Sequence, residues 1–265
     1  MEWVISNGAI DQLLYNGRNL IRTWGIETAD SSGHFSLEEG KGYRYTLFNH
    51  AVQSTATEVR NEMEIKMKES HFILSLYDRL FPEEGRVVRK TVVYFLSDSY
   101  LMDFVIRHRF KKEFIERARI ADQSIVHKNS NIYYQHPVRE VLLDGDPSVR
   151  VCITHEVETE QRGTFMYARD DFGEWVVHAR VLPLIPAKDV IKLCNAHFGT
   201  RPLPQFISDM IVHTPWLRNR LLYKSEKKPS RSFVTKCVNP NLFPMMHFKK
   251  DETISFDCEV TIFSS

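Results

Sequence analysis

The sequence predicts a mainly β protein in which long strands form antiparallel sheets. Over Glu58–Lys68 apolar and charged residues alternate, which is the period of a strand with one buried face. Short turn sequences such as Asn16-Gly17 and Pro82–Gly85 separate stretches of this kind, and strands joined by tight turns run antiparallel. Aromatic residues make up 12% of the chain, and aromatic and β-branched residues favour sheets.

The strands expected in the first half of the chain follow one another closely. In order, they are 9–15, 19–21, 58–68, 71–80, 86–96 and 101–110. The last of these has two distinct faces, because successive side chains of a strand point to opposite sides. One face carries Met102, Phe104, Ile106, His108 and Phe110; the other carries Asp103, Val105, Arg107 and Arg109.

The second half continues with two further hairpins. Strands 139–143 and 149–158 flank the turn Asp144–Pro147, and strands 164–169 and 174–181 flank the turn Asp170–Gly173. A closing strand at 253–263 is expected to dock on one of the sheets. Two segments with helical spacing interrupt the pattern, so short helices are expected near residues 187–223. No linker is evident, and residues 1–265 are predicted to form a single domain.

Composition and charge exclude several classes of protein. The 265 residues are 43% apolar and 26% charged, which is enough apolar surface for a packed core. The net charge of +1 gives no bulk attraction for nucleic acid or for an anionic membrane surface. No stretch approaches the roughly 20 apolar residues that span a bilayer. The first residues do not read as a secretory signal, and the four cysteines contain no C-x-x-C, so we expect a cytoplasmic protein.

Three stretches of the chain together resemble one known family: Ile5–Ile10 with Leu14–Ile21, Arg89–Phe110, and Phe248–Thr253. The first is similar to the opening hairpin of galactose-mutarotase-like proteins, the family that includes the aldose 1-epimerases. The second resembles the family's central sheet strands, and the third resembles its closing loop. The resemblance implies a β-supersandwich, in which two large curved antiparallel sheets pack face to face and a carbohydrate binds on one concave sheet face.

The chain departs from the epimerase pattern at the residues that carry catalysis there. Asn49-His50 is its only Asn-His pair; it lies early in the chain and lacks the following Asn of the family's general-acid motif. No catalytic role is therefore transferred from the family. Fold alone does not separate the family's epimerases from its non-catalytic sugar-binding domains.

The residues themselves suggest a sugar site on two strands. Glu174, His178 and Arg180 point the same way along one strand, and epimerase chemistry needs a carboxylate and an imidazole around one sugar oxygen, with an arginine to orient hydroxyls. We therefore predict Glu174 and His178 as catalytic groups and Arg180 as a substrate-binding group. Arg107 and Arg109 form a second row that suits an anionic sugar. A solvated sheet face with ion pairs is the alternative interpretation of both rows.

Tyr134 and His136 lie in an aromatic, polar stretch that is expected to be a loop and could contact a sugar. No metal-ligating spacing, phosphate-binding loop, dinucleotide motif or nucleophile elbow occurs, so no metal and no cofactor are expected.

Three functions remain open at this level. The first is a cofactor-free sugar epimerase or mutarotase, an isomerase, acting on a small carbohydrate or anionic sugar. The second is a non-catalytic carbohydrate-binding or accessory module. The third is a lyase or hydrolase of uronic-acid glycans, for which Tyr134 and His136 would act with Arg107 and Arg109. All three depend on whether the predicted residues converge in one cleft.

Overall fold

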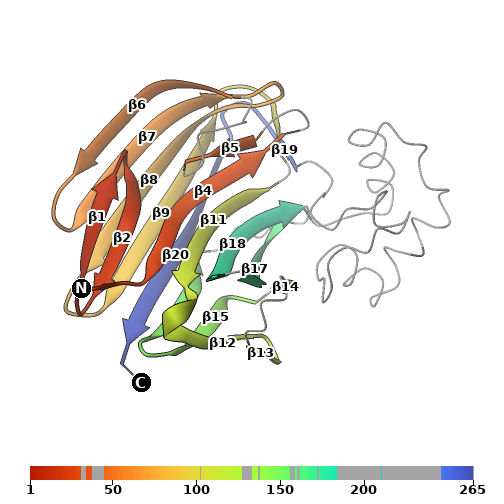
Figure 1. Cartoon of the computed structure of the whole chain (residues 1–265). Coiled ribbons are helices and arrows are strands. Elements are labelled where there is room, and N and C mark those ends of the chain that lie inside the picture. Colours follow the sequence, from red (N-terminus) through yellow and green to blue (C-terminus); the bar gives the residue numbers. More distant parts are fainter. Residues whose placement is uncertain are drawn as a thin grey trace.

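The computed structural model describes residues 1–30, 34–37, 45–101, 103–126, 133–136, 138–155, 159, 162–171, 173–183, 210 and 246–264. Over these residues the chain is built almost entirely of strands that form two large antiparallel sheets, which lie one over the other (Figure 1). The mainly β class and the two-sheet architecture predicted from the sequence are therefore confirmed. The helices expected near 187–223 lie outside the described residues apart from residue 210, and the single domain stays a prediction.

The first sheet, sheet A, has the strand order β1-β2-β4-β11-β18-β17-β14, with β3 paired to β2 and β5 paired to β4. Its strands are β1 (Glu2–Ser6), β2 (Ala9–Tyr15), β3 (Arg18–Asn19), β4 (Ile21–Ala29), β5 (His34–Ser36), β11 (Phe104–Lys111), β14 (Tyr133–His136), β17 (Arg162–Asp171) and β18 (Glu174–Pro183).

The second sheet, sheet B, has the order β13-β12-β15-β16-β20-β9-β8-β7-β6. Its strands are β6 (Thr46–Ser54), β7 (Glu58–Lys66), β8 (His71–Phe81), β9 (Arg86–Phe95), β12 (Ile115–Ile120), β13 (Gln123–Val126), β15 (Glu140–Gly145), β16 (Ser148–His155) and β20 (Thr253–Phe263). The closing strand β20 docks on this sheet, as expected, and it lies between β16 and β9 in the middle of the strand order. A short ladder of β10 (Ser99–Leu101) with β19 (Met246–Phe248) and the 3₁₀ turn η1 (Lys112–Phe114) complete the described elements.

Local sequence explains the tight turns. Tyr15 pairs with Arg18 across Asn16-Gly17, and both turn residues have positive φ, 49° and 75°. This is the backbone of a type I′ turn, which Asn-Gly favours because its twist matches that of the flanking strands. The hairpin predicted at this point is therefore confirmed.

The core fills the space between the two sheets. Alternating positions of β7, β8, β9 and β20 are buried, and their partners on sheet A are the inward residues of β4, β11, β17 and β18. Five phenylalanines at the centre have ring centroids 4.3 to 6.5 Å apart, and they bring β11 of sheet A against β8, β9 and β20 of sheet B and against β19. They are Phe72, Phe95, Phe104, Phe248 and Phe256.

The core also contains a buried ion pair. Arg89 of β9 donates two hydrogen bonds to Asp78 of β8, at 2.7 and 2.8 Å, and a third to the carbonyl of Gly25 on β4 at 3.2 Å. His108 of β11 packs edge-on against Trp24 nearby, and burial lowers its pKa to about 3, so its imidazole is neutral at pH 7. The hydrogen bond from Arg89 to Gly25 thus connects a charged side chain of sheet B directly to the backbone of sheet A.

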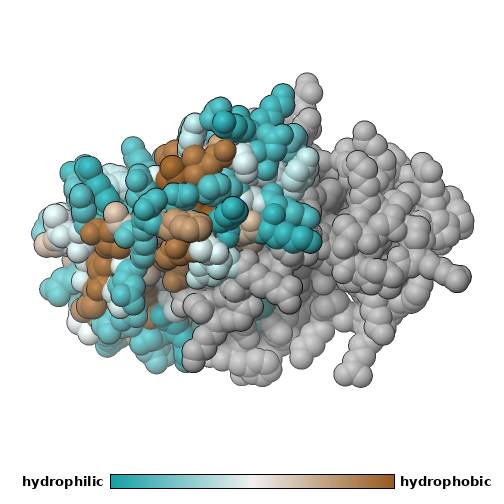
Figure 2. Space-filling model, turned by 90° about the horizontal axis from the view of Figure 1, so that it is seen from above, coloured by the Kyte–Doolittle hydropathy of each residue, from teal (hydrophilic) through white to brown (hydrophobic). Residues whose placement is uncertain are grey.

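Several large apolar side chains of the described residues are exposed. Seen from above in Figure 2, brown patches are divided by hydrophilic residues. The exposed apolar residues include Leu47, Phe48 and Val52 of the edge strand β6. No helix among the described residues is long and apolar enough to cross a membrane.

Candidate functional site

The candidate site lies on the face of sheet A that points away from the core, here called the outer face. Strands β11 and β18 pair antiparallel, with Arg107 opposite His178 and Arg109 opposite Val176. The intervening residues, such as His108 and Val177, are buried in the core. Because side chains alternate along a strand, Arg107, Arg109 and His178 share the outer face. Glu174 and Arg180 share it as well, since they lie four and two residues from His178 on β18.

The centre of this face combines an imidazole, a guanidinium and a carboxylate from three adjacent strands. Arg107 of β11 forms an ion pair with Glu27 of β4, with Nη1 and Oε2 3.0 Å apart. His178 lies directly opposite Arg107 in the register, and its ring stacks on Tyr167 of β17, with centroids 4.7 Å apart. Only 8% of Arg107 is exposed. This face therefore holds charged groups that are largely shielded from water.

The protonation state of His178 follows from its surroundings. Burial lowers its pKa well below 6.5; the nearby Glu27 carboxylate opposes that shift, and the cations Arg180, Arg107 and Arg169 add to it. The Nε2 atom is buried and has no hydrogen-bond partner among the described residues. The imidazole is neutral at pH 7 and can accept a proton.

Arg180 lies two residues beyond His178 on β18. Its Nη2 donates to the Asp103 carboxylate at 2.6 Å, and its guanidinium lies 5.8 Å from the centre of the Tyr167 ring. Arg180 is 6% exposed. The ion pair fixes the guanidinium at one side of the His178 imidazole.

Glu174 does not meet His178. Four residues along a strand separate their Cα atoms by about 13 Å, and Glu174 forms an ion pair with Arg109 at 3.5 Å instead. The carboxylate whose charge raises the pKa of His178 is that of Glu27, which was not among the predicted site residues. Nothing in the local pattern around Glu27 marks it, because its role comes from the pairing of β4 with β11.

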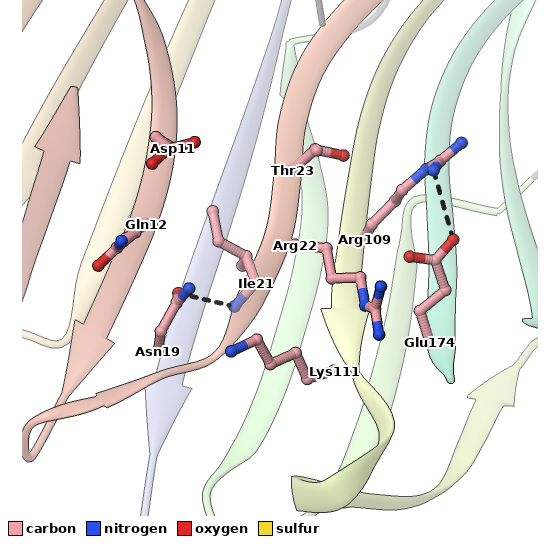
Figure 3. A pocket seen from close by; sticks show the side chains of 9 residues that line it. All are labelled: Asp11, Gln12, Asn19, Ile21, Arg22, Thr23, Arg109, Lys111 and Glu174. Atoms are coloured by element: carbon pink, nitrogen blue, oxygen red, sulfur yellow. Dashed lines mark hydrogen bonds and ion pairs between the residues drawn. The ribbon is translucent and has the colours of Figure 1, made fainter. Parts of the chain in front are cut away.

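A pocket opens on the outer face beyond Arg109, where β11 ends and β18 begins (Figure 3). It has a volume of about 760 Å³ and is open to solvent. Its lining is mostly polar and comes from β2, β3, β4, β11 and β18: Asp11, Gln12, Asn19, Ile21, Arg22, Thr23, Arg109, Lys111 and Glu174. Two predicted site residues, Glu174 and Arg109, thus belong to a second cluster rather than to the one around His178.

Tyr134 and His136 lie in an edge strand, not in the loop that the sequence suggested. They belong to β14, where Tyr134 pairs with Ala168 and His136 with Met166 of β17. Alternating apolar and polar residues are too few over four positions to distinguish such a strand from a loop. Their side chains lie outside the described residues, so their predicted contact with a sugar stays a prediction. Among the described residues no group of three or more His, Cys, Asp and Glu side chains could hold a metal ion.

Comparison with known proteins identifies the fold. The galactose mutarotase related enzyme of Lactobacillus acidophilus aligns over 99% of this chain and 94% of its own length, with 9% sequence identity and a TM-score of 0.50. A galactose mutarotase-like protein of Lactobacillus casei aligns over 98% and 97%, with 7% identity and a TM-score of 0.46. One of Clostridium acetobutylicum aligns over 98% and 90%, with 8% identity and a TM-score of 0.44.

The first alignment shows that this chain has the galactose-mutarotase-like fold, so the resemblance predicted from the sequence is confirmed. The other two alignments score too low to add to that conclusion. A scan against protein-family models and a search of curated proteins found no match.

Proposed function

We propose that the outer face of sheet A binds a carbohydrate derivative and that His178 moves a proton during cofactor-free isomerisation at the sugar's anomeric centre. The observation that carries this proposal is the position of His178 opposite Arg107 on adjacent strands, with Glu27 paired to that arginine at 3.0 Å. The galactose mutarotase related enzyme that shares the fold supports the choice of a sugar as the ligand.

The shielding of the charged groups supports a binding role over a solvated sheet face. Arg107 and Arg180 are each less than a tenth exposed, and each is held by a carboxylate, Glu27 or Asp103. Fixed guanidinium groups in a partly dry site bind hydroxyls and anionic oxygens more strongly than groups in bulk water do. An ordinary solvated face would leave long charged side chains extended into water.

The proton chemistry can be followed at stated atoms. Opening a sugar ring moves a proton from the anomeric hydroxyl to the ring oxygen, while the bond between the ring oxygen and the anomeric carbon breaks. Neutral His178 would accept the hydroxyl proton at Nε2, and the imidazolium would then give that proton to the ring oxygen. Glu27 stabilises the imidazolium, because its charge raises the pKa of His178. Arg107 would stabilise negative charge that develops on the sugar oxygens.

The test is a panel of aldoses, uronic acids and hexose phosphates, with exchange between the anomers measured by magnetisation-transfer NMR. We expect the wild type to accelerate exchange of at least one sugar at pH 7. His178→Asn and Glu27→Gln should each lower that rate about a hundredfold or more, the usual contribution of a general acid–base group and its partner. Arg150→Gln serves as the matched control, because Arg150 pairs with Glu140 on the exposed face of sheet B.

Binding without turnover is the second candidate, favoured by the missing Asn of the epimerase motif after Asn49-His50. In that case calorimetry would detect a sugar, and Arg107→Gln would weaken its binding, but no variant would change the exchange rate. If no member of the panel binds or exchanges faster, both candidates are wrong.

A further inference from the structure

The edge strand β6 differs from the strands at the other ends of the two sheets. It is nine residues long, whereas β1, β13 and β14 have five, four and four residues. It pairs with β7 on one side and with no described strand on the other (Figure 1). All nine residues are exposed, and none of them is Lys, Arg, Asp or Glu. Proteins often protect a sheet edge by keeping it short or by placing charges on it, and β6 is neither short nor charged.

A β-bulge divides β6 into two regular segments. The ladder with β7 covers Thr46–Phe48 and resumes at Ala51–Ser54. Between the segments lie Asn49, whose φ is 46°, and His50. These two residues are the Asn-His pair that lacks the rest of the epimerase motif. Because the bulge lies at the middle of the strand, it leaves a regular segment on each side.

Side chains of β7 hold the bulge in one conformation. The Asn49 amide donates to the Glu64 carboxylate at 2.8 Å. The His50 ring is hydrogen-bonded to the Asn61 side chain at 2.9 Å, and Asn61 donates to the carbonyl of Gly8 in the β1–β2 turn at 3.1 Å. The strand is therefore ordered before it meets another strand, which lowers the entropic cost of association.

The bulge also brings two apolar side chains to the same face of β6. Leu47 pairs with Ile65 and Val52 pairs with Asn61, and both of these partners are buried on the core side of β7. Residues five apart point to opposite faces of a regular strand, but the extra residue of the bulge reverses this. Leu47 and Val52 thus share the core-side face, although they are 39% and 41% exposed.

The backbone groups of these two residues point away from β7. Thr55 donates its N–H to the Glu58 carbonyl, and hydrogen-bonded pairs alternate along an antiparallel ladder. On β7, every second residue from Glu58 is therefore bonded to β6, and the residues between them are bonded to β8. Leu47 and Val52 pair with residues of the second kind. Their N–H and C=O groups therefore face the open side of β6.

We infer that β6 pairs with β6 of a second copy of this chain, antiparallel about a two-fold axis at the bulge. In this register Leu47 of each copy lies opposite Val52 of the other, so apolar side chains meet on one face and backbone donors meet acceptors. Phe48 lies opposite Ala51 on the other face, since both pair with residues on the solvent side of β7. The two copies of sheet B then form one continuous sheet.

The strand favours a second copy over a strand of another protein. The match in face and in backbone direction is between two residues of the same strand, Leu47 and Val52, and a two-fold axis uses it twice. A strand without Lys, Arg, Asp or Glu meets no charge repulsion from its copy. The closed dimer also removes the exposed edge of both copies. This pairing does not depend on the proposed function.

Sedimentation velocity over a wide range of protein concentration tests the pairing. We expect the wild type to dimerise reversibly, and Val52→Glu to raise the Kd of the dimer about tenfold or more, because the substitution enters a two-fold interface twice. Val4→Glu is the matched control. Val4 is also 41% exposed, but it lies on the edge strand β1 of sheet A, so this variant should dimerise as the wild type does. Circular dichroism checks that the variants fold.

Two double variants test the register. Leu47→Glu with Val52→Glu places like charges opposite each other across the axis and should be monomeric. Leu47→Lys with Val52→Glu places opposite charges there and should dimerise. Equal dimerisation of the two double variants, whether strong or weak, overturns the register.

The pairing itself is overturned if the wild type stays monomeric, which would leave the edge to a strand of another protein. It is overturned as well if Val52→Glu dimerises as tightly as the wild type, or if Val4→Glu weakens the dimer as much as Val52→Glu does.

Discussion

Arg89 and Asp78 connect the two sheets at the scale of single residues. Both side chains are essentially inaccessible to water, at 0% and 1% exposure. Taking such charges out of water is costly, and the cost is offset only while the two-fold hydrogen bonding between guanidinium and carboxylate is complete. The third hydrogen bond, to the Gly25 carbonyl, reaches β4 directly beside Arg107, because Gly25 and Arg107 are register partners. The pair thus supports the strand that carries Glu27.

Replacing one member of this pair should destabilise the protein strongly. Asp78→Asn leaves the Arg89 charge buried without its carboxylate, and we expect the free energy of unfolding to fall by about 3–5 kcal/mol. Asp144→Asn is the control, since Asp144 pairs with the half-exposed Arg117 and Arg119 and should cost less than about 1 kcal/mol. Urea denaturation measures both. Equal losses of unfolding free energy in the two variants would show that the buried pair contributes no more to stability than the exposed pair does.

At the scale of elements, the backbone packs closely where β15 meets η1. A Cβ added at Gly145 would overlap the carbonyl oxygen of Phe114 and lie 2.8 Å from the Cα of Ile115. Neither atom belongs to a flexible side chain, so the two segments would have to separate. Gly17, in the β2–β3 turn, is different: its φ is +75°, but nothing lies within 4 Å of an added Cβ.

Substituting these two glycines distinguishes the free-energy cost of a steric overlap from that of backbone strain. Gly145→Ala should lower the free energy of unfolding by about 3 kcal/mol or more, because the overlap is with backbone. Gly17→Ala should cost only about 1–2 kcal/mol, the strain of a left-handed alanine. Melting temperatures followed by circular dichroism provide the comparison. A Gly17→Ala variant that melts below Gly145→Ala would contradict the close contact between β15 and η1.

At the scale of the whole molecule, the sequence predicts features that neighbouring residues determine, but not those that depend on contacts between distant parts of the chain. Alternation is local, so the shared faces of Arg107 with Arg109 and of Glu174 with His178 and Arg180 follow from the sequence and agree with the structure. The neighbours of a strand in a sheet are set by distant parts of the chain. The approach of β4 to β11, which brings Glu27 to the site, therefore has no local signal.

A bulge in β4, where Arg22 has no partner in the ladder with β11, also escapes prediction. The bulge places Ile21 and Trp24, three residues apart, both in the core, and apolar residues three apart do not by themselves distinguish a bulged strand from a turn or a helix. Alternation places Glu174 and His178 on the same face of β18, but side chains that lie four residues apart on one strand are too far apart to touch. The two residues therefore do not belong to one cluster. The site that results is assembled from β4, β11, β17 and β18 together.

The most direct test of the central claim, that the outer face of sheet A is the sugar-binding surface, is NMR of histidine side chains during titration with the sugar panel. Labelled histidine gives separate imidazole signals, and His178→Asn assigns the signal of His178. We predict that a bound sugar shifts the His178 signal, while the signal of His155, exposed on sheet B, does not move. A sugar that shifts His155 and leaves His178 unchanged would contradict the claim, as would a panel in which no member shifts His178.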